Sequence, residues 1–222
     1  MLARVLIVTA ALGACGTLEG VDAPGVGDDA GPDAGGSDAA LEAAAEAGPE
    51  ASTTIDLTPS KDAYVEDGTS VDTSFGTSAQ LRVKGNSGGM LDRSSWLSFD
   101  IHAFTSVTSA RLRLSVVSLD TGNTDPIPNL IEYAPTTSDG WDESTLTWND
   151  APPAGPVVAQ RTVTDADLGM SVEFDVTAAV AADTDGVATF VVTSPPSTGR
   201  GLTYSSREGL TKPVLRVTGI VP

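Results

Sequence analysis

Most of the chain consists of short runs in which apolar and polar residues alternate. In "QLRVKG", Leu81 and Val83 share one face of an extended segment, and Arg82 and Lys84 share the other. The longer run "SARLRLSVVSL" repeats this alternation. Because successive side chains of a β-strand point to opposite faces, each run predicts a strand with one buried and one solvated face.

Eight further runs of this kind are separated by Gly, Pro, Asn and Asp. They are Ser95–Ile101, Leu130–Ala134, Thr145–Trp148, Val157–Val163, Ser171–Asp175, Val187–Ser194, Leu202–Ser205 and Val214–Thr218. No long stretch has a helical period, and one short helical turn is expected at Thr177–Ala182. About ten strands in roughly 170 residues predict an all-β fold, an antiparallel β-sandwich of jelly-roll type.

The segment ahead of these strands has a different composition. Gly16–Ser52 contains nine acidic residues and neither Lys nor Arg, and it is otherwise mostly Ala, Gly and Pro. It cannot bury a core, so residues 15–52 are expected to be a disordered acidic tether before a folded module at residues 53–222. That module keeps a formal charge of −10, which argues against nucleic acid and anionic membrane surfaces as partners.

Residues 1–14 predict an export signal. An apolar run follows Arg4, and small residues stand before the chain's single cysteine, Cys15. The run is shorter than the ~20 residues that span a bilayer. Leu12-Gly13-Ala14-Cys15 resembles the bacterial lipobox, in which the signal is cut before the cysteine and the thiol is acylated. This predicts a lipoprotein anchored through lipid on Cys15, outside the cytoplasm, at the cell envelope (the outer membrane is favoured) or the cell surface. An ordinary export signal is the alternative.

Six motifs of the folded part occur in a characteristic order. They are "DAYVEDGTSVDTSFGTSAQLRV", "RSSWLSFDIHAF", "SARLRL", "WDESTLTWNDAPPAG", "VEFDVTAAV" and "YSSREGLTKPVLRV". In this order they resemble the DNRLRE type of secreted bacterial domain, also classed as carbohydrate-binding module family 96 and similar to the disaggregatase-related modules. The resemblance covers Thr53–Gly219. It implies a β-sandwich outside the cell that binds polysaccharide, with alginate-like acidic polymers among the ligands of the group.

An acidic polysaccharide requires cations on one accessible surface. Arg82 and Lys84 share a strand face, and Arg93 begins the next predicted strand, so these three are candidate ligand-binding residues. The alternative is that they are solvated residues protecting a sheet edge. The charge of −10 opposes an acidic ligand.

The tryptophans of "GWDESTLTWND" could form a sugar-stacking platform or part of a core. Leu146 and Trp148 are two residues apart and would share a strand face, which favours a core position for Trp148. Trp141 follows Asp139-Gly140 at a loop, where the pattern forces neither burial nor exposure. Trp141 is therefore a candidate ligand-binding residue, and the alternative is that its ring covers one end of the sandwich.

Other motif residues have simpler interpretations. Asp100 and Asp175 each end a predicted strand, where a carboxylate can accept hydrogen bonds from free backbone N–H groups. Arg207 and Glu208 are adjacent and would point to opposite faces if they lay on a strand. Arg207 is a candidate for ligand binding, with structural pairing to a carboxylate as the alternative.

The sequence offers little catalytic chemistry. The single histidine, His102, has no nucleophile motif to work with, and no metalloprotease, P-loop or dinucleotide motif occurs. Two suitably placed carboxylates would suffice for glycoside hydrolysis, but the resemblance favours a protein that is not an enzyme.

A metal is left open. Asp62, Glu66, Asp67 and Asp72 supply oxygen ligands of the kind that calcium prefers, so a structural calcium ion is one interpretation and a solvated acidic turn is the other. No other cofactor is expected.

Taken together, these features predict a lipid-anchored, non-catalytic module that binds polysaccharide. The alternative is a structural or adhesive surface protein that uses the same sandwich to bind another protein.

Overall fold

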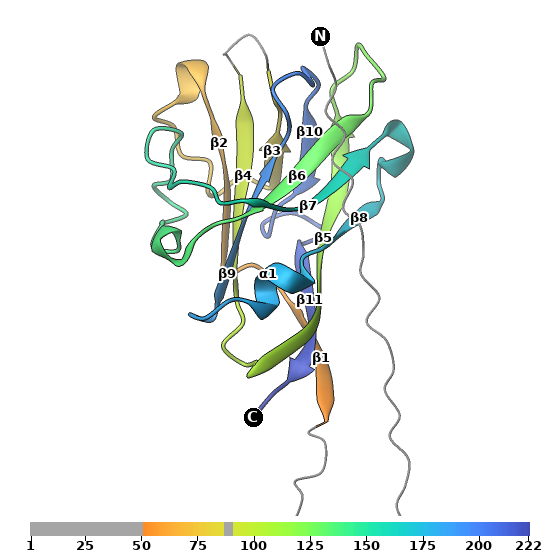
Figure 1. Cartoon of the computed structure of the whole chain (residues 1–222). Coiled ribbons are helices and arrows are strands. Elements are labelled where there is room, and N and C mark those ends of the chain that lie inside the picture. Colours follow the sequence, from red (N-terminus) through yellow and green to blue (C-terminus); the bar gives the residue numbers. More distant parts are fainter. Residues whose placement is uncertain (1–50, 87–90) are drawn as a thin grey trace, which may run out of the picture. The chain divides into compact units, whose positions relative to one another are not determined.

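The computed structural model describes residues 51–86 and 91–222 (Figure 1). The strands are β1 (Ser52–Leu57), β2 (Lys61–Glu66), β3 (Gln80–Val83), β4 (Arg93–Asp100), β5 (Ser106–Leu119), β6 (Ile127–Tyr133), β7 (Val157–Val163), β8 (Ser171–Asp175), β9 (Val187–Thr193), β10 (Leu202–Ser205) and β11 (Val214–Ile220). One α-helix, α1 (Thr177–Ala181), and three 3₁₀ turns, Gly68–Ser70, Thr136–Ser138 and Asp165–Asp167, complete the described elements. No helix in these two ranges is long and apolar enough to cross a bilayer.

The first sheet is antiparallel, with the strand order β1-β11-β5-β10-β3. Its long strand β5 pairs with β11 along Ser106–Arg113 and with β10 along Val116–Leu119. Strand β8 pairs with β5 along Arg111–Ser115. Because Arg111–Arg113 pair with both β11 and β8, these two strands flank β5 on opposite sides.

The second sheet is also antiparallel, with the order β2-β4-β9-β6-β7. The main hydrophobic core lies between the sheets, where Leu97, Phe99 and Phe190 of the second sheet meet Leu112 and Leu215 of the first. All five side chains are buried. The predicted antiparallel β-sandwich is therefore confirmed.

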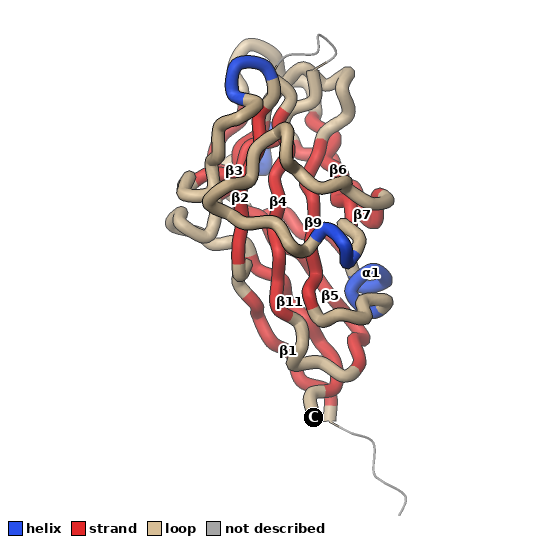
Figure 2. Tube along the Cα trace, turned by 90° about the vertical axis from the view of Figure 1, so that its left-hand side faces the viewer, coloured by secondary structure: helices blue, strands red, loops and turns tan. Residues whose placement is uncertain are grey.

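A loop, residues 134–156, covers the outer face of the second sheet, crossing β9, β4 and β2 in the view of Figure 2. Trp96 on β4 and Val191 on β9 contact Trp141 and Leu146 of this loop in a second hydrophobic cluster, and Trp148 packs against it. All three tryptophans of the chain thus belong to one cluster outside the main core.

The predicted strand Thr145–Trp148 is wrong. The segment forms turns, with the Leu146 N–H donating to the Asp142 carbonyl at 2.9 Å. The Asp142 carboxylate also accepts the Ser144 N–H at 2.7 Å, an arrangement that closes a turn instead of extending a strand. Leu146 and Thr147 are consecutive and both buried, so the spacing of Leu146 and Trp148 reflects a loop that packs on a sheet.

Strands β1 and β2 were not predicted. Five of the six residues of β2 are buried, because its inward side faces the sandwich and its outward side lies in the second cluster. A strand buried on both faces shows no alternation. The acidic stretch from Asp62, for which a solvated turn is one of the two interpretations, therefore begins as a strand.

The capping roles predicted for two aspartates are confirmed. Asp100 accepts the His102 N–H at 3.1 Å, and Asp175 accepts the N–H and the hydroxyl of Thr177 at 3.1 and 2.7 Å. The Thr177 hydroxyl lowers the pKa of Asp175, because the hydrogen bond favours the charged carboxylate. Helix α1 begins at this threonine, as the sequence predicts, and ends one residue before the predicted Ala182.

Candidate functional site

The outer face of β1, β11, β5 and β8 is open to solvent, unlike that of the second sheet. The register places Asp56, Arg216, Arg111 and Asp175 in one row across the four strands. Their side chains are between 46 and 55% exposed. The outward residues of these strands, all of which the structure describes, include no aromatic side chain. This is a flat, polar surface.

Three arginines form the centre of this surface, which we call the arginine face (Arg111, Arg113 and Arg216). Arg216 donates to both carboxylate oxygens of Asp56 at 2.7 and 2.8 Å, and these hydrogen bonds lower the pKa of that carboxyl. Arg111 pairs with Asp175 of β8 at 3.0 Å, and Arg113 pairs with Glu173 of the same strand at 3.0 Å. Each guanidinium has five N–H donors, so each keeps donors for a further acceptor.

The structure places Arg82 and Lys84 on β3 and its extension, and Arg93 on the neighbouring strand β4. Lys84 on the extension of β3 is the bridge partner of Arg93 on β4, and Arg82 lies two residues before Lys84. Two of them have ion-pair partners: Lys84 pairs with Asp120 at 3.1 Å, and Arg93 pairs with Glu66 at 2.6 Å. Only 17% of each of these two side chains is exposed.

Arg82 lies over the ring of Tyr64, with its guanidinium carbon 5.5 Å from the ring centroid. The ring of this tyrosine is also stacked on Phe75, with the centroids 4.2 Å apart. Contact of Arg82, Lys84 and Arg93 with a ligand stays a prediction.

Trp141 is buried, with 9% of its surface exposed. Its Nε1–H donates to the Ser98 hydroxyl at 3.2 Å, its ring meets Trp96 edge to face at 6.4 Å, and the Lys61 ammonium lies 4.6 Å from its centroid. Trp148 is only partly buried. The loop contacts therefore bury Trp141 more deeply than Trp148, the reverse of the order that the sequence indicated.

Arg207 lies in a turn after β10 and not on a strand. It donates to Glu143 at 2.6 Å and to Glu208 at 2.7 Å, so the two adjacent residues of the motif contact each other instead of facing apart. Its backbone N–H donates to Asp62 at 2.8 Å. Arg207 is thus at the centre of a carboxylate cluster formed by Asp62, Glu143 and Glu208.

The carboxylate cluster joins three parts of the fold. Asp62 lies on β2, Glu143 on the covering loop and Glu208 in the turn after β10. The Asp62 N–H donates to Glu143 at 2.9 Å. Gly76 lies against the Glu143 backbone so closely that a Cβ there would be 1.8 Å from its carbonyl oxygen. The position of Glu143 is therefore set from two sides.

Asp62 is the most buried member of the cluster, with 1% of its surface exposed. Burial raises its pKa to about 7, and the negative charges of Glu208 and Glu143 act in the same direction. One of its oxygens, Oδ1, has no hydrogen-bond partner. Among the candidate metal ligands, Asp62 therefore combines deep burial with an oxygen that has no partner.

The four acids proposed for calcium do not converge. Glu66 pairs with Arg93, Asp67 accepts the Asp92 N–H at 2.7 Å, and Asp72 accepts the Asn149 amide at 2.6 Å. Only Asp62 belongs to a group of three potential ligands within the described residues, together with Glu143 and Glu208. The other two ligands come from distant motifs, which the sequence spacing could not reveal.

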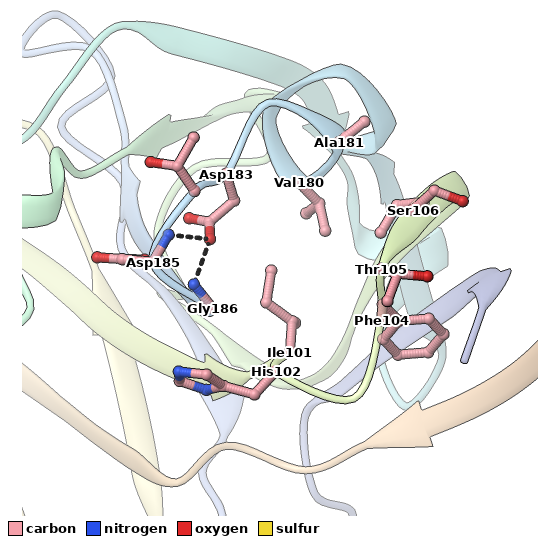
Figure 3. Close-up of a pocket in the computed structure, with 12 residues that line it drawn as sticks. Ile101, His102, Phe104, Thr105, Ser106, Val180, Ala181, Asp183, Asp185 and Gly186 are labelled. Atoms are coloured by element: carbon pink, nitrogen blue, oxygen red, sulfur yellow. Dashed lines mark hydrogen bonds between the residues drawn. The ribbon is translucent and has the colours of Figure 1, made fainter. Parts of the chain in front are cut away.

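A pocket of about 340 Å³ lies between the segment 101–107 and the end of α1 (Figure 3). Asp183 closes the turn on one side by accepting the N–H groups of Asp185 and Gly186 at 3.2 and 2.8 Å. His102 also lines it, but 63% of this imidazole is exposed and its Nδ1 is paired with Asp100 at 2.9 Å. The pocket therefore brings no buried general base to a nucleophile.

Comparison with known proteins identifies the sequence family of the chain. The sequence profile of carbohydrate-binding module family 96 matches residues 53–219. The chain belongs to carbohydrate-binding module family 96. The resemblance carried by the six motifs is thereby confirmed.

This family 96 module is also similar to a gellan lyase from a Bacillus species, with 33% identity over 112 residues. The match covers 50% of this chain and 4% of the lyase, so the chain spans a small part of that relative.

The arginine face of this family 96 module was missed as a site. Alternation in "SARLRL" does place Arg111 and Arg113 on one solvated face, the same signal that selected Arg82 and Lys84. Arg216 joins them only through the register of β11 on β5, in which it lies opposite Arg111. Sequence spacing carries no information about that pairing.

Proposed function

We propose that this protein is a non-catalytic, lipid-anchored module that binds acidic polysaccharide on its arginine face. The observation that carries the proposal is the open outer face of β1, β11, β5 and β8, with Arg111, Arg113 and Arg216 at its centre. Membership of family 96 supplies the class of ligand. The proposed anchor is Cys15, which lies outside the described residues.

The spacing of the three guanidiniums suits an extended polymer. Arg111 and Arg113 are two residues apart on β5, which is about 7 Å along a strand, and Arg216 lies directly opposite Arg111, about 5 Å away. An arginine can bind a carboxylate through two parallel N–H donors, and such charge-assisted bonds are strong and directional. Successive acidic sugars lying across the strands could therefore each meet a cation.

The existing ion pairs do not block this use. Arg111, Arg113 and Arg216 are 47, 38 and 47% exposed, and exposed pairs contribute only about 0–1 kcal/mol each. These pairs therefore hold the arginines only weakly, and the N–H donors that they leave free are available to a polymer carboxylate. Lys84 and Arg93 are less accessible, at 17% each.

Affinity electrophoresis of the full chain tests this proposal. Native gels would contain alginate, gellan, pectin, xylan or a neutral glucan, with a polymer-free gel as the reference for mobility. We expect retardation by the acidic polymers that fades as salt rises, because screening shortens to ~3 Å at 1 M salt. Retardation by the neutral polymers alone would contradict an acidic ligand.

Two sets of variants locate the surface. Arg111→Gln/Arg113→Gln/Arg216→Gln should abolish retardation, and Arg82→Gln/Lys84→Gln should leave it intact. The reverse result would move the site to the end of β3. A thermal melt of each variant verifies folding.

Two further results bear on the function class. A folded parent that no gel retards would overturn carbohydrate binding and leave the structural or adhesive alternative. Release of reducing ends from alginate or gellan by the purified chain would contradict a non-catalytic role.

A further inference from the structure

The carboxylate cluster of Asp62, Glu143 and Glu208 gathers three acidic side chains around Arg207. Each residue offers an oxygen, and these ligand atoms all lie within 4.8 Å of one another. Arg207 contacts all three residues and supplies one positive charge. The cluster therefore sets three carboxylates against the one guanidinium that contacts them directly.

The orphan oxygen of Asp62 is a second and independent observation. Asp62 is 1% exposed, and its Oδ2 accepts the Arg207 N–H while its Oδ1 has no partner. Buried carboxylates in folded proteins are normally paired, hydrogen-bonded or bound to a metal, because an unsatisfied one is costly. An acceptor is therefore available at the buried end of the cluster.

We propose that Asp62, Glu143 and Glu208 bind a calcium ion. Oxygens that bind one calcium ion at ~2.4 Å can be at most about 4.8 Å apart, and the three ligand atoms meet this limit. A divalent cation would add positive charge where three carboxylates face one guanidinium.

The cluster is accessible from one side. Glu208 is exposed, and Arg207 and Glu208 line a depression of about 270 Å³ with Lys212. Water can complete the six to eight oxygen ligands of calcium from this side. The bound ion would join β2, the loop 134–156 and the turn after β10, and so would hold the covering loop on its sheet.

Calcium uptake by the full chain tests the site. After dialysis against EDTA, isothermal titration with CaCl₂ should give one site per chain. Asp62→Asn and Glu143→Gln keep the side-chain shape and should each weaken binding at least tenfold. The matched control is Asp142→Asn, which removes an exposed carboxylate from the same loop and should bind as the parent does.

Thermal melts give a readout that does not depend on the titration. In EDTA the parent should melt no higher than Asp62→Asn, because the variant lacks an unpaired buried charge. In CaCl₂ the parent should melt several degrees higher than the variant, and NaCl of equal ionic strength should not reproduce this shift. The site does not rely on carbohydrate binding, so a failure of either proposal can be recognised separately.

Three results would overturn the calcium site. The parent could take up no more calcium than Asp62→Asn, the two conservative variants could bind as tightly as Asp142→Asn, or the parent could keep the same melting temperature in EDTA and CaCl₂.

Discussion

Replacing Trp141 by alanine should destabilise the protein strongly and detach the covering loop. The ring is 9% exposed, and truncation of a buried Trp costs about 3–5 kcal/mol. Area gives a similar figure, since about 150–250 Å² of buried aromatic surface at ~25 cal/mol/Å² corresponds to about 4–6 kcal/mol as an upper bound. We take about 4 kcal/mol as the expected loss of unfolding free energy.

The specific contacts of the ring allow a graded series. Trp141→Phe keeps most of the packing but removes the Nε1–H that donates to Ser98, which should cost only about 1 kcal/mol. The Lys61 ammonium above the ring adds about 0.5–1 kcal/mol that alanine also removes. The expected order of stability is parent, then Trp141→Phe, then Trp141→Ala.

Thermal unfolding followed by circular dichroism measures this series. For a domain of this size, 1 kcal/mol corresponds to about 2–4 °C, so Trp141→Ala should lower the melting temperature by roughly 10 °C or more. Leu168→Ala, at a position that is 53% exposed, is the control and should change little. A melting temperature of Trp141→Ala close to that of the parent, together with lost retention in a polysaccharide gel, would refute the structural role and make the ring a sugar platform.

Three further predictions concern other parts of the chain. Gly76→Ala should cost about 1–3 kcal/mol or more in urea unfolding, because the new Cβ would lie 1.8 Å from the Glu143 carbonyl oxygen, whereas Gly140→Ala, which meets no atom within 4 Å, should be tolerated. Burial and neighbouring carboxylates raise the pKa of Asp139, so its contribution to the free energy of unfolding is greatest below the ordinary pKa of 3.8 and is lost as the pH rises through the raised value. Asp139→Asn should flatten that part of a plot of unfolding free energy against pH, and an unchanged slope would contradict the assignment. Cys15→Ala should move the protein from the detergent phase to the aqueous phase in phase partition, and a variant that stays in the detergent phase as the parent does would exclude the lipid anchor.

Local chemistry explains what could be predicted. Strands with one buried face, such as β5 and β8, reveal themselves because burial of alternate residues imposes a period of two on the sequence. Asp100 and Asp175 were predictable as caps, since each acts on a backbone N–H only two residues away. The helix start at Thr177 follows from the second of these contacts.

Contacts between distant segments explain what was missed. Trp141 is buried because its loop packs on the outer face of the second sheet, the face opposite the main core. No local sequence pattern distinguishes that loop from a strand. Glu143 and Arg207 meet Asp62 across 81 and 145 residues of sequence, and Arg216 meets Arg111 through strand register. Such pairings depend on the order of the strands in each sheet.

The sequence by itself determined the fold class, its family resemblance and the residues that face water on each half-buried strand, because these depend on side-chain period and local backbone bonding. The tertiary structure alone decided which outer face stays open, which cations share it, and that three carboxylates from separate motifs meet beside Arg207. The physical reason is that a sandwich core needs only apolar side chains at alternating positions. The course of the connecting loops and the pairing of the strands then place the charged residues on the outside.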